Sequence, residues 1–177
     1  MSYKKWYKFI FYFLLLGLMV IFQITFLGGL NLFWANFNLV LAGLVVLVAL
    51  ADFNQALVYA VLAGVMMDVY SSLPFGIFLA VLFILAIILE ILFLNFFTNR
   101  SFYSLIIMGL IAVLIYHLLF FIISGLFYLT GVSEFFGGHK IWLALLYQLA
   151  DLTILLALVF WVLNKISKRF KPTFIQT

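Results

Sequence analysis

The sequence predicts an all-α protein, a polytopic bundle of about six transmembrane helices that forms one integral membrane domain over residues 1–177. Composition is the first reason, because 69% of the residues are hydrophobic and only 8% are charged, whereas soluble domains carry about 25% charged residues. The second reason is spacing: polar, glycine and proline positions divide the chain into apolar segments near the roughly 20 residues that cross a membrane. The chain also has no cysteine, which excludes disulfides, thiolate metal sites and cysteine nucleophiles.

The predicted spans are residues 9–28, 32–51, 56–70, 77–97, 102–126 and 141–163. The first follows Lys4, Lys5 and Lys8 and ends at Gly28. Its apolar run is too long for a signal peptide and no cleavage site follows, so we expect a retained anchor. The second and third spans are separated by a polar turn at residues 52–55. Both are short or polar at one end, which favours a tilted hairpin whose helices do not each cross the full bilayer.

The last three spans are bounded by stronger breaks. Pro74 and Gly76 interrupt the chain before the fourth span, because proline lacks an N–H and glycine tolerates positive φ. A polar turn at residues 98–101 precedes the fifth span, and a loop at residues 131–140 precedes the sixth. Basic residues between 165 and 171 then end the membrane domain.

The basic residues predict the orientation of this bundle. With six spans, eight of the nine lie on one side, at the chain ends and at Arg100, and only Lys140 lies on the other. The positive-inside rule therefore places both termini in the cytoplasm. The net charge of +4 is accounted for by cations beside the lipid bilayer, so we expect no nucleic-acid partner.

Polar side chains within the spans are the candidates for function. An ionised carboxylate in hydrocarbon is costly unless it is paired, protonated or hydrated. Asp52, Glu134 and His139 fall in turns, where we expect solvation. The intramembrane polar residues are Asp68, Glu90, His117, Gln148 and Asp151, and the nearby donors for the carboxyl groups are His117, Tyr116, Tyr147, Gln148 and Asn95. Contacts between helices, a ligand, ion or proton site and a partner contact are the three interpretations.

Small residues recur on one face of the third span. Ala56, Ala60, Gly64 and Asp68 are four positions apart, so they share a helix face that allows another backbone to approach closely. This face packs either within the chain or against another membrane protein. Ala56, Ala60 and Gly64 are therefore the partner-facing candidates.

No motif for catalysis is present. The sequence lacks a nucleophile elbow, a paired-histidine zinc motif and a glycine-rich phosphate loop, and it contains only two histidines. We therefore expect no enzyme activity, no catalytic residues, no metal and no cofactor. Transport is harder to dismiss, since interrupted helices and buried carboxylates are typical of binding sites near the membrane midplane, although the two halves show no clear repeat.

Residues 63–76 resemble the signature of the MreD family of rod-shape-determining membrane proteins. In that family a glycine-bearing helix leads to an aspartate, a short polar stretch and a Pro-x-Gly that enters the next helix, as at Gly64, Asp68, Pro74 and Gly76. The length, the span number and the near absence of soluble loops also fit. The turn at residues 52–55 departs from the family, in which many members have basic residues there.

This resemblance implies a non-enzymatic scaffold in the bacterial inner membrane. It would bind a bitopic MreC-like protein and other cell-elongation proteins, and support rod shape and peptidoglycan synthesis. Asp68 is expected to hold the turn as a hydrogen-bond acceptor, from Ser71, Ser72 or free N–H groups before Pro74. An Asp68→Asn variant should then keep its fold and much of its function.

The competing interpretation is a small-molecule binding subunit of a vitamin-type transporter. Such subunits also have six short helices, and they resemble one another through an Ala-x-x-x-Ala face on the first helix that docks the transport module. The first span here, residues 9–28, contains no alanine. The scaffold is therefore the favoured prediction.

Overall fold

The computed structural model of the chain describes residues 14, 17–27, 38–50, 53–96, 102–131 and 140–166. These residues form helices and a turn at residues 71–76, with no strand among them, which confirms the all-α class. The elements are η1 (Gln23–Leu27), α3 (Leu39–Leu50), α4 (Phe53–Tyr70), α5 (Ile77–Phe96), α6 (Phe102–Leu129) and α7 (Lys140–Ile166). Residues 17–22 are also helical and lead into η1, a π-helical turn.

Within the described residues, three helical segments are long and apolar enough to cross a membrane: Phe53–Tyr70, Ile77–Phe96 and Tyr103–Leu129. Shorter apolar stretches lie at Leu39–Ala49 and Leu145–Trp161. The coarse prediction of a helical membrane protein is therefore supported by the structure. The basic residues behind the predicted orientation, together with Asp52, Glu134 and His139, lie outside the residues or side chains that are described.

Two predicted helix starts are wrong, and α6 and α7 each run three residues beyond their predicted ends at 126 and 163. The second span was expected from residue 32, but α3 begins only at Leu39, because Asn38 is its N-cap. The third was expected from residue 56 after a turn at 52–55, but α4 already begins at Phe53. Polar residues are tolerated there because the first helical turn has free N–H groups. At 12 residues, α3 is about 18 Å long, which is shorter than a hydrocarbon core of about 30 Å.

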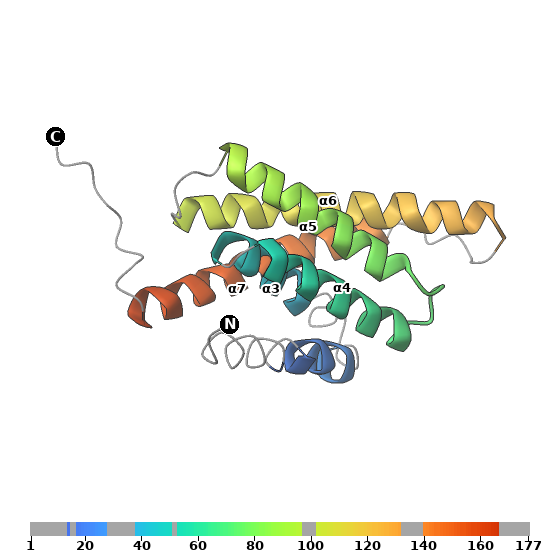
Figure 1. Cartoon of the computed structure of the whole chain (residues 1–177), viewed down its shortest axis with the longest axis horizontal. Helices are drawn as coiled ribbons and strands as arrows, with labels where there is room; N and C mark the ends of the chain where they lie inside the picture. Colours follow the sequence, from blue (N-terminus) through green and yellow to red (C-terminus); the bar gives the residue numbers. More distant parts are fainter. Residues whose placement is uncertain are drawn as a thin grey trace.

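Two antiparallel hairpins make up most of the bundle (Figure 1). Helices α4 and α5 are joined by a turn at residues 71–76, and α6 runs antiparallel to α7. The short helix α3 contacts all four of these helices. The bundle is therefore arranged around α3.

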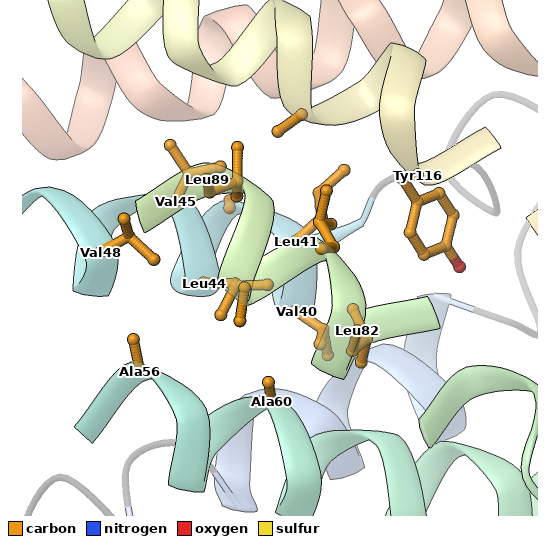
Figure 2. Packing of buried hydrophobic residues seen from close by; sticks show 14 of the residues in the cluster. Val40, Leu41, Leu44, Val45, Val48, Ala56, Ala60, Leu82, Leu89 and Tyr116 are labelled. Atoms are coloured by element: carbon orange, nitrogen blue, oxygen red, sulfur yellow. The ribbon is translucent and has the colours of Figure 1, made fainter. Parts of the chain in front are cut away.

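Helix α3 is apolar on every side, as expected for a helix surrounded by protein. Figure 2 shows its side chains between those of α4, α5 and α6. Its fully buried members are Val40, Leu41, Ala42, Leu44 and Val45. The large exposed apolar side chains instead lie on the outer helices, with Phe83, Ile91, Leu118, Ile122, Ile154 and Leu158 among them. An apolar outer surface around an apolar centre suits a bundle that is solvated by lipid.

Candidate functional site

The turn between α4 and α5 contains the motif predicted from the sequence. Ser71 N–H donates to the carbonyl oxygen of Asp68 at 3.3 Å, and Leu73 N–H donates to the Ser71 hydroxyl at 3.0 Å. Gly76 has a φ of 106°, a conformation that L side chains rarely adopt. Its carbonyl oxygen accepts the first hydrogen bond of α5, from Ala80 N–H at 3.0 Å. Gly76 is therefore the N-cap of α5, and it has no side chain with which to cap the helix.

Asp68 supplies the missing cap from the preceding helix. Its Oδ1 accepts a hydrogen bond from Phe78 N–H and its Oδ2 accepts one from Leu79 N–H, both at 2.9 Å. These are N–H groups of the first turn of α5, which have no partner within the helix. The Asp68 side chain is 3% exposed. A buried carboxylate thus joins the end of α4 to the start of α5, where the helix dipole also attracts a negative charge.

Asp68 is a hydrogen-bond acceptor as predicted, but the predicted donors are wrong. The N–H groups that it accepts follow Pro74 in the chain, and the Ser71 hydroxyl accepts a hydrogen bond within the turn instead. The expected effect of the Asp68→Asn substitution changes as well. Because both carboxylate oxygens accept N–H groups, an amide would satisfy one donor and turn its own NH₂ toward the other. The free energy of unfolding of Asp68→Asn should therefore lie between those of the native chain and of Asp68→Leu.

The small-residue stripe of α4 packs inside the chain, so the prediction that Ala56, Ala60 and Gly64 face a partner is wrong. Ala56 and Ala60 are 0% exposed, and Figure 2 shows them directed at the side chains of α3 and α5. A Cβ on Gly64 would lie 2.6 Å from the Leu79 Cα and 3.0 Å from its backbone nitrogen. Gly64 thus brings the α5 backbone close enough for Leu79 N–H to reach Asp68.

The N-terminus of α3 is capped in a similar way. Asn38 Oδ1 accepts a hydrogen bond from Leu41 N–H at 2.9 Å, and Gln23 Oε1 accepts one from Val40 N–H at 2.8 Å. Gln23 Nε2 also donates to Asn38 Oδ1 at 3.4 Å. Gln23 lies in η1, fifteen residues before Asn38 in the chain. Its side chain therefore holds η1 against the start of α3.

Tyr116 on α6 lies between these two capped helix ends. Its hydroxyl group lies near the Asn38 side chain and close enough to Asp68 for an electrostatic interaction. One turn along α6, the Phe120 ring contacts the Phe78 ring at a centroid distance of 5.6 Å. We call Gln23, Asn38, Asp68 and Tyr116 the capping cluster. It brings η1 and the N-termini of α3 and α5 to one place on α6.

The chemistry of the capping cluster is structural. Both oxygens of Asp68 are bonded to backbone N–H groups, and Asn38 and Gln23 are bonded to α3 and to each other. Among the described residues, no group of three histidine or carboxylate side chains is placed to hold a metal ion. In a membrane, a helix end without such partners would leave N–H groups exposed to hydrocarbon. The cluster therefore satisfies helix ends inside the bundle.

The other intramembrane polar residues do not join this cluster. Glu90 lies eleven residues beyond Leu79 on α5, which is about 16 Å along the helix. His117 Nδ1–H donates to the Val113 carbonyl oxygen at 3.0 Å, and Asn95 Nδ2 donates to the Ile91 carbonyl oxygen at 2.9 Å. Two of the predicted donors are therefore bonded to their own helices rather than to a carboxylate.

Asp151 and Gln148 are buried one turn apart on α7, with 2% and 6% of their surfaces exposed. Asp151 Oδ2 is buried with no hydrogen-bond partner. The neighbouring Leu152 and Leu156 side chains lie where a Cβ on Gly109 of α6 would be. Asp151 is therefore a buried acid on a helix that packs against α6, and one of its oxygens is unbonded.

We expect Asp151→Leu to leave the free energy of unfolding unchanged or to raise it. Leucine has a similar size, and the substitution removes a buried polar atom that forms no hydrogen bond, an atom that costs about 1–3 kcal/mol when unsatisfied. Unfolding by SDS in mixed micelles, followed by tryptophan fluorescence, measures the difference. A loss of more than about 2 kcal/mol, typical of a broken buried network, would show that Asp151 has a required partner.

The sequence analysis named Tyr116 only as a possible donor to the carboxyl groups, and it missed Gln23 and Asn38 as site residues. Asn38 had a usable signal, because an asparagine directly before an apolar helical run is a common N-cap. Gln23 had none, since its partner is far away in the chain and only the packing of η1 brings the two close.

No family model matches this chain, and no curated protein or solved structure matches it either.

Proposed function

We propose that this protein is a non-enzymatic scaffold of the bacterial cell-elongation machinery, similar to MreD, which binds an MreC-like bitopic protein in the inner membrane. On this proposal the chain crosses the membrane about six times, with both termini in the cytoplasm. Its role would be to hold partners together and so support peptidoglycan synthesis and rod shape.

The observation that supports this proposal most is the structural use of the motif that resembles the MreD signature. Gly64 allows the close approach of α5, Asp68 caps that helix, and Gly76 provides the positive φ at its start. The acid at the centre of the motif is bonded to backbone N–H groups on both oxygens. A motif that fixes a helical hairpin, with its carboxylate engaged in capping, favours a scaffold over an enzyme.

The buried stripe changes where a partner would bind. Gly64 and Ala60 are covered by α5 and α3, so leucine at either position would disturb the hairpin before it affected any partner. The contact surface of a scaffold must therefore lie on an outward face of the bundle. Helices α5, α6 and α7 offer such faces.

The proposal predicts a stable complex with an MreC-like protein. The tagged chain is co-expressed with the MreC-like protein of the same genome and purified in a mild detergent, with an unrelated single-span protein as the control. We expect stoichiometric recovery of the MreC-like protein alone. Equal recovery of both proteins, or of neither, would overturn the proposal.

Native mass spectrometry of the same preparation separates the scaffold from the vitamin-type alternative. A scaffold should give the mass of the protein complex with lipid adducts of variable number. A small molecule bound at one copy per chain would favour the transporter subunit instead.

A further inference from the structure

The outward face of α5 has a carboxylate at its centre. Phe83, Ile87, Glu90 and Leu94 are spaced by four, three and four residues, which is the spacing of a seam that packs against one other helix. Phe83 is 39% exposed and Leu94 is 66% exposed, while Ile87 and Glu90 are partly buried. We call these four residues the α5 seam. It is the one place on the three candidate spans where an acidic side chain is not buried in the bundle.

Glu90 has no partner within the described chain. None of the hydrogen bonds of the described residues involves its side chain, although Asn95 on the same helix is bonded to the backbone. Its neighbours on the seam are apolar. A carboxylate in this position is costly in lipid, and in membrane proteins such groups mark a pathway or a pairing partner.

We propose that the α5 seam binds the single transmembrane helix of the bitopic partner, and that a lysine or arginine of that helix pairs with Glu90. This inference rests on the proposed function and names the surface that performs it. Phe83, Ile87 and Leu94 pack against apolar side chains of the partner helix. The ion pair with Glu90 fixes the register of the partner helix along α5.

The position of Glu90 along α5 favours a basic partner residue. Glu90 is six residues before Phe96, the last residue of α5, which is about 9 Å along the helix. On the proposed topology this end of α5 is cytoplasmic. Because lysine and arginine concentrate at the cytoplasmic ends of membrane spans, a parallel or antiparallel partner helix would present a cation near this depth.

A second copy of this chain fits the seam less well. A symmetric contact through the same face would bring the two Glu90 side chains toward each other, and like charges at close range oppose association. The stripe of small residues that often forms such dimers is already buried against α5. Charge therefore selects a different protein with a complementary cation.

The test uses the full chain co-expressed with the MreC-like protein. We expect Glu90→Lys to reduce recovery of the partner at least tenfold, and Glu90→Leu to reduce it less. Replacing the basic residue at the cytoplasmic end of the partner's span with glutamate should restore recovery with Glu90→Lys. The matched control is Leu118→Lys, which places the same charge on the outward face of α6, where Leu118 is 59% exposed, and should retain the partner.

A photoreactive benzoylphenylalanine at Phe83 or at Leu118 provides a second measurement in a chain that keeps Glu90. We expect a cross-link to the partner from position 83 and none from position 118. If the native chain recovers the partner but Glu90→Lys recovers it equally and position 83 gives no cross-link, the seam is wrong and the scaffold stands. If the native chain recovers no MreC-like protein, the proposed function and this surface both fail.

Discussion

Replacing Asp68 with leucine is expected to cause the largest loss of stability among the substitutions at the capping cluster. The substitution leaves the N–H groups of Phe78 and Leu79 without acceptors in the interior of the bundle. A buried unsatisfied donor costs about 1–3 kcal/mol, so the two together should cost roughly 2–6 kcal/mol. Reversible unfolding by SDS in mixed micelles measures this difference directly.

The series Asp68→Leu, Asp68→Asn and Asp151→Leu tests the explanation. The asparagine variant keeps one acceptor and should lose about half as much stability as the leucine variant. Asp151→Leu is the matched control, because it removes an equally buried carboxyl group that has an unbonded oxygen. Equal losses for Asp68→Leu and Asp151→Leu would mean that burial of the acid, rather than helix capping, determines the effect.

Substitution of Gly64 is expected to separate α4 from α5. Even Gly64→Ala would place a Cβ 2.6 Å from the Leu79 Cα, and backbone atoms cannot move aside as a flexible side chain can. Overpacking of this kind costs about 1–3 kcal/mol, and Gly64→Leu should prevent the native hairpin from forming. The stability of Gly64→Ala is measured by unfolding in SDS. The folding of Gly64→Leu is measured by the yield of folded protein in size-exclusion chromatography.

Gly125 on α6 provides the control for this prediction. A Cβ there would meet nothing within 4 Å, so Gly125→Ala should be neutral or stabilise the helix by up to about 1 kcal/mol. Gly64 and Asp68 should also be coupled, because Leu79 N–H contacts one and bonds the other. In a double-mutant cycle, Gly64→Ala with Asp68→Asn should cost less than the sum of the single variants. Strict additivity would contradict the shared contact.

The helical class and most of the element boundaries were predictable from the sequence because apolar run length and the breaks at Pro74 and Gly76 are local signals. The predicted fourth span and α5 both begin at residue 77. The position of α3 in the bundle was harder to predict, since an apolar segment of that composition is equally consistent with a lipid-facing span and a buried helix. Only the packing of the outer helices shows that α3 lies at the centre.

The candidate site was predictable in part for the same reason. The motif residues Gly64, Asp68 and Gly76 interact across one short turn, so their sequence spacing reflects their contact. The packing partner of the small-residue stripe could not be predicted, because helix periodicity shows which residues share a face but not what packs against that face. Gln23 and Tyr116 are joined to the cluster only by tertiary packing.

The burial of α3 constrains how the protein is inserted into the membrane. The ribosome makes α3 before the four helices that surround it, and at 12 residues it is too short to be released into lipid as an independent span. Its polar cap at Gln23 and Asn38 would also be exposed to hydrocarbon until α6 arrives. Helix α3 therefore has to wait at the insertion machinery or at the membrane surface until α6 and α7 are made. Chains that end before α6 should accordingly be recognised as unassembled and degraded.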